Sequence, residues 1–186
     1  MHFNGQRILP AIKKLKDFEK LLQSEMVYMV LLDVHIAQLE SIMRYARKMK
    51  KRVILHADLI QGLRSDEYAA EFLCQSFKPD AIISTRSEML KTAKKNRVLA
   101  IQRTFLLDTL AIETSYKLAD KVQPDYIEVL PGIIPGFIRK FHQEICIPVI
   151  AGGLIHTKAE VDAALDAGAV AITSSRELLW TSRYAQ

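Results

Sequence analysis

The stretches IPVIAGGLI (147–155) and AVAITSSR (169–176) both read as buried strands that end in small or hydroxyl-bearing residues. Each begins as a short apolar run, the pattern of a strand covered on both faces. Six similar runs precede them, and near-continuous apolar strands of this kind favour a parallel sheet. The earlier runs occupy 7–11, 26–32, 52–58, 80–85, 98–104 and 125–130.

Segments with helical periodicity separate these apolar runs. In 12–22, apolar side chains recur at helical spacing and form one stripe, with lysines on the opposite side. Each segment therefore predicts a helix that covers one face of the sheet. The other segments of this kind are 36–49, 67–77, 87–95, 109–121, 136–143 and 158–167.

Hydroxyl residues just beyond three of the strands predict where helices begin. Each is followed three residues later by a glutamate, which is the capping-box pattern. The pairs are Thr85 with Glu88, Thr157 with Glu160 and Ser174 with Glu177. Asp108 is a further candidate cap for the helix at 109–121.

Eight alternations of strand and helix predict parallel strands with helical crossovers, and eight is the count that closes a barrel. We therefore expect residues 1–186 to form a single α/β domain, a compact (β/α)8 barrel of the TIM type. The chain is shorter than the roughly 250 residues usual for this fold, so its loops must be short. An open doubly wound sheet is the alternative, but it more often has a glycine-rich loop where this chain has Pro10-Ala11-Ile12.

Composition narrows the class of protein. Hydrophobic residues make up 49% and charged residues 25%, which is ordinary for a globular chain, and no linker interrupts it. No apolar run reaches the length of a membrane helix, and the first ten residues lack a signal-peptide core. With only two cysteines at no motif spacing, we expect a cytoplasmic protein without a membrane partner. The net charge of +5 is compatible with a polyanionic partner.

The two opening stretches predict a phosphate site. They would be strands seven and eight, whose following loops frequently bind phosphate in such barrels. Gly152 and Gly153 would let the backbone approach an anion closely. Ser174 and Ser175 would add donors, together with the first free amides of an expected last helix. A tight turn and a simple helix cap would use the same residues, and both interpretations can hold together.

Two arginines strengthen the prediction of an anion. Arg176 follows the Ser174–Ser175 pair, and Arg86 follows Thr85. A cation at a helix N-terminus opposes the helix dipole, at a cost of up to about 1 kcal/mol, unless an anion lies there. The alternative is that both side chains extend into water.

Polar residues at the other strand ends predict the rest of a pocket. His56 and Asp58 are two residues apart and should share one face of the third strand. Polar groups in apolar strands need partners, so they form a buried network, a ligand site or both. The candidates for the polyol end of a ligand are Asp33, His56, Asp58, Gln102 and Glu128.

No motif selects a metal or a cofactor. A metal held by Asp33, Asp58 and Glu128 is an alternative that nothing in their spacing favours. The chain has no nucleophile elbow, P-loop, HExxH motif or zinc-ligand spacing. We expect no metal and no cofactor, and no catalytic residue is assigned.

The ordered set of these motifs resembles the glycerol uptake operon antiterminator regulatory proteins. The resemblance covers nearly the whole chain. It rests on PAI (10–12), LHADLI (55–60), IIST (82–85), QRTFLLD (102–108), DYIEVLPG (125–132), and IPVIAGGLI (147–155) through TSSRELLW (173–180). It implies a compact TIM-like barrel that binds glycerol 3-phosphate as effector, acts on leader mRNA and prevents premature transcription termination.

The resemblance also implies residue roles. Gly152, Gly153, Ser174 and Ser175 would hold the phosphate, and His56, Asp58, Gln102 and Glu128 would be candidates for the glycerol end. It implies no RNA-contacting residues. Two dense basic runs, RYARKMKKR (44–52) and KTAKKNR (91–97), end helices on the expected bottom rim and are our RNA candidates. Their basic residues are Arg44, Arg47, Lys48, Lys50, Lys51, Arg52, Lys91, Lys94, Lys95 and Arg97.

Two functions from different classes remain. The first, which the resemblance favours, is a non-catalytic RNA regulator that senses glycerol 3-phosphate. The second is a phosphosugar isomerase, synthase or aldolase that uses His56, Asp58 or Glu128 as acid and base. No lysine ends a predicted strand, which disfavours Schiff-base chemistry. A homo-oligomer is possible, and the sequence does not decide it.

Overall fold

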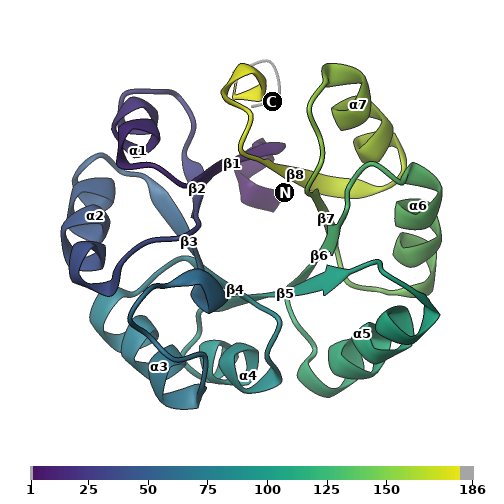
Figure 1. The fold of residues 1–186 in the computed structure, drawn as a ribbon, viewed down its shortest axis with the longest axis horizontal. Coiled ribbons are helices and arrows are strands. Elements are labelled where there is room, and N and C mark those ends of the chain that lie inside the picture. Colours follow the sequence, from purple (N-terminus) through teal and green to yellow (C-terminus); the bar gives the residue numbers. More distant parts are fainter. Residues whose placement is uncertain (1, 181–186) are drawn as a thin grey trace.

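The protein folds as a closed barrel of eight parallel strands surrounded by helices (Figure 1). The computed structural model describes residues 2–180; Met1 and residues 181–186, which the single-domain expectation includes, lie outside that range. The strands follow one another around the barrel in chain order, and β8 closes it by pairing with β1. The strands are β1 (Ile8–Ile12), β2 (Tyr28–Leu31), β3 (Arg52–His56), β4 (Ala81–Ser84), β5 (Leu99–Phe105), β6 (Tyr126–Leu130), β7 (Val149–Gly152) and β8 (Ala169–Ser174).

Within the described residues, seven α-helices link the strands and cover the outside of the barrel (Figure 1). They are α1 (Leu15–Leu22), α2 (Ile36–Lys48), α3 (Glu67–Phe72), α4 (Ser87–Lys95), α5 (Thr109–Val122), α6 (Pro135–Glu144) and α7 (Lys158–Asp166). The predicted helix at 67–77 is α3 continued by a π-helical segment, Leu73–Phe77. The predicted barrel is therefore confirmed, and the open-sheet alternative is wrong.

Two apolar layers hold the barrel together. The inner layer fills the barrel and includes Leu9, Val30, Ile54, Ile101 and Ile150. The outer layer packs the other faces of the strands against the helices. Because residues in a strand alternate between these layers, the layer of an apolar neighbour tells which way a polar side chain points.

The N-terminal segment closes the end of the barrel where the strands begin. Phe3 is 5% exposed and belongs to the inner layer. Its ring lies 5.4 Å from that of Tyr28 and 4.8 Å from that of Tyr126, two residues that begin β2 and β6. A ligand must therefore enter from the opposite end, where the strands finish.

The three predicted capping boxes have different outcomes. Thr157 caps α7 and Glu160 completes the box. Asp108, predicted separately, accepts a hydrogen bond from the Ala111 amide and caps α5. The prediction for Thr85 is wrong, because α4 begins after Arg86 and has no side-chain cap.

The prediction for Ser174 is also wrong. Ser174 is the last residue of β8, and up to Trp180, where the described chain ends, only a short 3-10 turn, Glu177–Leu179, follows it. Ser174 Oγ accepts from the Arg176 amide at 3.2 Å, which is a local turn and not a helix cap. The expected contribution of a last α-helix to an anion site therefore disappears, and any such site must rely on loops and side chains.

Candidate functional site

A hollow of about 250 Å³ opens at the carboxyl ends of the strands, the end opposite Phe3. Its volume lies below the range of drug-sized ligand sites, so it fits a small metabolite. It is lined by Ala11, Lys13, Leu32, Leu59, Arg103, Leu130, Gly153, Leu154, Ile155, His156, Thr173, Ser174, Ser175 and Arg176. Most of its polar lining comes from the end of β8 and from the loops after β7 and β8.

Glycine is required at both positions after β7 for different reasons. A Cβ on Gly152 would lie 2.3 Å from Thr173 Oγ1 and 2.9 Å from Glu128 Oε1, so no side chain fits there. Gly153 has φ +74°, a backbone conformation that L-residues with side chains rarely adopt. The β7 end therefore runs closely over the floor of the hollow and then turns sharply.

Ser174 and Ser175 line the hollow on the side of β8. The Ser174 hydroxyl donates to the Ile155 carbonyl at 3.2 Å, which ties the β8 end to the loop after β7. Trp180 Nε1 donates to the Ser174 carbonyl at 2.8 Å and holds the chain after β8. Ser175 is exposed and lines the hollow. The structure thus brings Gly153, Ser174 and Ser175 to one cavity, with Gly152 against its floor.

A buried ion pair forms the floor. Glu128 on β6 is fully buried, and its Oε2 lies 2.7 Å from Nε of Arg103, whose side chain is 12% exposed. Thr173 Oγ1 donates to Glu128 Oε1 at 2.6 Å. Arg103 follows Ile101 of the inner layer by two residues, which is why it points into the barrel. Both carboxylate oxygens are therefore partnered, and Arg103 is the member of the pair that lines the hollow.

His56 also faces the inside of the barrel, two residues after Ile54 of the inner layer. It is 3% exposed, and neither ring nitrogen has a hydrogen-bond partner among the described residues. Burial, with a contribution from the charge of Arg103, lowers the pKa of His56 to about 4. At neutral pH the ring is therefore uncharged, with one free donor and one free acceptor.

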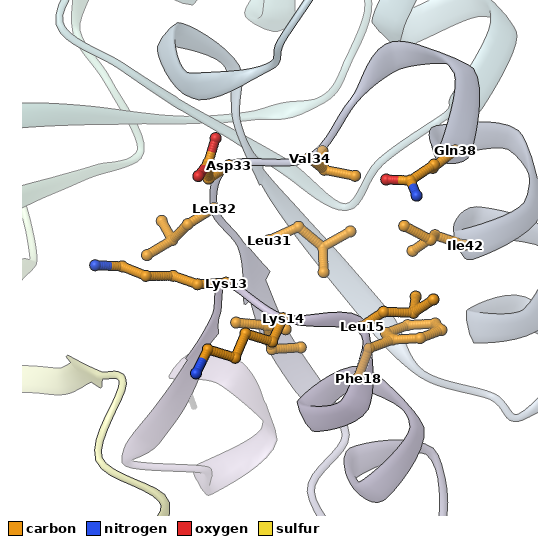
Figure 2. Close-up of a pocket in the computed structure, with 11 residues that line it drawn as sticks. Lys13, Lys14, Leu15, Phe18, Leu31, Leu32, Asp33, Val34, Gln38 and Ile42 are labelled. Atoms are coloured by element: carbon orange, nitrogen blue, oxygen red, sulfur yellow. The ribbon is translucent and has the colours of Figure 1, made fainter.

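Two cations stand above this floor. Arg176 donates from Nε to His156 Nδ1 at 2.6 Å, which joins the loops after β8 and β7. Lys13 follows β1 directly, and Figure 2 shows Lys13 and Leu32 pointing away from the side on which Leu31, Ile42 and Phe18 pack. No strand of the described chain ends in a lysine, but β1 extends one residue beyond the predicted run, to Ile12, so that Lys13 lies directly after it.

The charges of the hollow match a dianion. Among the described residues that line it, none is a carboxylate, and Arg103 is neutralised by Glu128 beneath it. Lys13 and Arg176 then remain as two positive charges. A phosphate monoester carries about −1.5 to −2 charge at pH 7, which balances them.

Gln102, predicted for the polyol end, points the other way. It lies between Ile101 and Arg103, so it faces the helix layer. Its amide nitrogen donates to the carbonyl and hydroxyl oxygens of Ser115 on α5, both at 3.0 Å. The prediction that Gln102 faces the mouth is wrong, and Arg103 takes that position.

The spacing of Asp58 and His56 predicted that they share one strand face, but in the structure they do not. The strand ends at His56, and Asp58 lies in a 3-10 turn, Ala57–Leu59. Its carboxylate accepts from Ser84 Oγ at 2.5 Å and from the amide and hydroxyl of Thr85 at 2.7 and 2.8 Å. Asp58 therefore fixes the loop after β4 and does not line the hollow.

Asp33 and Arg86 also lie outside the hollow. Asp33 accepts from Gln61 Nε2 at 2.7 Å and lines a neighbouring pocket between β1, β2 and their helices (Figure 2). Arg86 follows β4, across the barrel from the loops after β7 and β8 (Figure 1). Its backbone amide donates to Ser84 Oγ at 3.0 Å.

The three carboxylates considered for a metal are dispersed. Asp33, Asp58 and Glu128 each have different partners, as described above. Within residues 2–180, no three His, Cys, Asp or Glu side chains come close enough to hold a metal ion. In the same range, no helix is long and apolar enough to cross a membrane.

The two basic runs lie where the strands begin, away from the hollow, and several of their side chains have intramolecular partners. Lys51 Nζ donates to the carbonyls of Ser24 and Met26 at 2.5 and 2.8 Å. Arg52 pairs with Asp80 at 2.8 Å. Arg47 donates to the Phe77 carbonyl, Lys94 to the Gln123 carbonyl, and Lys91 pairs with Glu88. Five basic residues of the two runs are exposed and have no such hydrogen bond or ion pair in the described chain. They are Arg44, Lys48, Lys50, Lys95 and Arg97.

Comparison with known proteins places this barrel in a family. A family model described as glycerol-3-phosphate responsive antiterminator matches residues 8–180. The chain belongs to this family.

Members and relatives of the antiterminator family share the whole barrel. A glycerol uptake operon antiterminator regulatory protein from Listeria monocytogenes is 48% identical, with 97% of both chains covered and a TM-score of 0.94. An antiterminator-related protein from Thermotoga maritima is 28% identical over 94% of this chain and 98% of the other, with a TM-score of 0.82. The uncharacterized protein YgcP of Escherichia coli is 29% identical over 94% of this chain and 91% of its own length.

Four polar residues of the hollow in this antiterminator-family protein were not among the predicted ligand residues: Lys13, Arg103, His156 and Thr173. Thr173 lies inside the stretch 169–176, and His156 directly follows the stretch 147–155. Their polarity was the available signal. Arg103 and Gln102 are adjacent polar residues in an apolar strand, and only the choice of layer separates them.

Proposed function

We propose that this protein is a regulator that binds glycerol 3-phosphate in the barrel hollow and, with it bound, acts on leader mRNA to prevent premature transcription termination. The observation that carries the proposal is the hollow itself. Glycine and serine strand ends with two uncompensated cations, Lys13 and Arg176, lie above a charge-balanced polar floor. The membership of the antiterminator family supports the effector and the RNA target.

The phosphate would lie between the loops after β7 and β8. Gly153 and Ser175 offer backbone without bulky side chains, and Lys13 and Arg176 supply the charge. The glycerol end would point toward Arg103 and His56. His56 suits a hydroxyl group, because an uncharged imidazole both donates and accepts.

A thermal melt tests effector binding. A ligand of the native state at one hundred times its dissociation constant should add about 2.7 kcal/mol of stability. Millimolar glycerol 3-phosphate should therefore raise Tm, and glycerol should not. An unchanged Tm would remove the effector from the proposal.

A matched pair of glycine variants locates the phosphate. Gly153→Val should abolish the shift, because valine is strained at φ +74° and its side chain would project toward Leu130. Gly136→Ala is the control, since a Cβ at Gly136 meets nothing within 4 Å. Normal binding by a folded Gly153→Val variant would place the phosphate elsewhere.

We propose that RNA binds those basic residues of the two runs that are exposed and have no intramolecular hydrogen bond or ion pair in the described chain. Arg44, Lys48, Lys50, Lys95 and Arg97 lie in the last turns of α2 and α4 and in the segments that lead from them into β3 and β5, on the side opposite the hollow. Each lost contact to a single-stranded RNA phosphate should lower the log–log salt slope by about 0.7. The variant that replaces Lys48 and Lys50 with Gln should weaken leader-RNA binding and flatten this slope, without changing effector affinity. Unaltered affinity and slope would exclude these two lysines.

Catalysis is the second candidate, because Lys13 follows a strand end and lines the hollow together with His156. NMR of glycerol 3-phosphate or a triose phosphate during prolonged incubation with the protein tests it. The regulator proposal predicts an unchanged ligand spectrum. Turnover that disappears in Lys13→Met would establish an enzyme instead.

A further inference from the structure

Arg103 reaches the ligand hollow already neutralised. Its Nε lies 2.7 Å from Glu128 Oε2, and the carboxylate is fully buried while the guanidinium is 12% exposed. The backbone leaves room for this ion pair, because Gly152 lacks a side chain that would collide with Glu128 and Thr173. The floor thus presents guanidinium N–H donors without net positive charge.

The remaining floor groups are uncharged as well. Thr173 donates its proton to Glu128 at 2.6 Å, so its oxygen faces other groups as an acceptor. His56 faces the same barrel interior, is buried, and has both ring nitrogens without a partner among the described residues. Donors and acceptors are both present, which is what a hydroxyl group needs, since it donates one hydrogen bond and accepts others.

We propose that Glu128 sets the ligand specificity of the hollow: by neutralising Arg103, it selects phosphates whose other end is an uncharged polyol and rejects those that carry a carboxylate there. This inference rests on the proposed function, because it names the chemistry of the same ligand's second end. Glu128 acts through Arg103 and is a specificity-determining residue.

The physical reason is the balance of charge around a buried carboxylate. A ligand carboxylate that accepted from Arg103 would approach Glu128, a second negative charge that no described cation other than Arg103 compensates. In a site of reduced dielectric, like charges a few ångströms apart repel by several times their energy in water. A hydroxyl avoids this repulsion and still bonds to Arg103 and His56.

Two ligands isolate this effect in the wild-type protein. Glycerol 3-phosphate and 3-phosphoglycerate share the phosphate and the central hydroxyl, and differ in a terminal CH2OH or carboxylate. Calorimetric titration at pH 7.5 should show glycerol 3-phosphate binding at least about tenfold more tightly. Lys13 and Arg176 attract the extra negative charge of 3-phosphoglycerate. This attraction favours binding of 3-phosphoglycerate, so it opposes the expected preference for glycerol 3-phosphate.

The variant Glu128→Gln tests the assigned residue. It keeps the shape and leaves Arg103 uncompensated, so the preference for glycerol 3-phosphate should fall by about tenfold or reverse. Thr173→Val is the matched control, because it removes a neutral bond to the same carboxylate and keeps its charge. Thr173→Val should change both affinities alike and preserve their ratio.

The outcomes separate the two proposals. If neither ligand binds the wild-type protein, the proposed function fails and this inference fails with it. If both bind with similar affinity, or folded Glu128→Gln keeps the wild-type ratio, the effector site stands and the role of Glu128 is overturned. If Glu128→Gln does not melt cooperatively, the wild-type ratio alone decides, and a ratio near one overturns the inference.

Discussion

At the scale of single residues, the floor of the hollow keeps a histidine uncharged. Burial and, to a smaller extent, the charge of Arg103 lower the pKa of His56 from 6.5 to about 4, although Glu128 and Asp58 oppose the shift. The desolvation outweighs the two nearby carboxylates. Each pKa unit corresponds to about 1.4 kcal/mol, so this residue couples the stability of the barrel to pH.

The sign of that coupling is fixed. Between pH 6.5 and about 4 the unfolded chain binds a proton at His56 that the folded protein does not. The free energy of unfolding should therefore fall as pH drops through this window, by about 3 kcal/mol in total, and be unaffected by this residue above it. His56→Gln should flatten the curve. Denaturant titrations of both proteins from pH 7.5 to 4 measure the difference, and parallel curves would contradict it.

A second residue-scale prediction concerns Lys51, one of the RNA candidates. Its Nζ donates to the carbonyls of Ser24 and Met26, and partial burial lowers its pKa. Lys51→Gln should destabilise the protein by about 1 kcal/mol, because the two carbonyls lose their donor. Lys48→Gln is the control, and it should leave the free energy of unfolding unchanged. Equal effects of both variants would show that Lys51 has no structural role.

At the scale of elements, the capping patterns show what short-range sequence decides and what it does not. All three have a hydroxyl followed by Glu, yet Thr157 alone caps a helix through that pattern. Thr85 bonds instead to Asp58, which lies 27 residues away in sequence. Ser174 stays in β8 because strand pairing continues through it to Pro10. Partners distant in sequence override the local pattern.

The helix cap gives an element-scale prediction. Thr157→Ala should lower the free energy of unfolding by about 1 kcal/mol, because the Glu160 amide loses its acceptor. Glu88→Ala tests the pattern that does not form a cap, and its Tm should stay close to that of the wild-type protein, because only exposed contacts to Ser87 and Lys91 are lost. Thermal melts compare the two, and a Glu88→Ala variant as unstable as Thr157→Ala would contradict the assignment.

At the scale of the whole molecule, the barrel was predictable because eight apolar runs at regular spacing admit few arrangements. The direction of individual side chains was not. In β5 every residue from Ala100 to Gln102 is buried, whichever layer it faces. The strand therefore has no regular alternation of apolar and polar residues that would show which layer Gln102 or Arg103 faces. The loops that border the hollow were predictable from glycine and serine at two strand ends, whereas Lys13 was missed because it follows the strand.

The proposed regulator also predicts a property of the complete complex. If glycerol 3-phosphate tightens leader-RNA binding by some factor, saturating RNA must tighten glycerol 3-phosphate binding by the same factor. Calorimetric titrations with and without RNA measure both. A factor of one would contradict the proposed coupling of effector and RNA.

The central claim is that the hollow between the loops after β7 and β8 is the effector site. A crystal structure with glycerol 3-phosphate tests it most directly. We predict the phosphate beside Gly153 and Ser175, within reach of Lys13 and Arg176, and the glycerol hydroxyls toward Arg103 and His56. Ligand density on another face of the barrel, or a phosphate lying against Arg103 and Glu128, would contradict it.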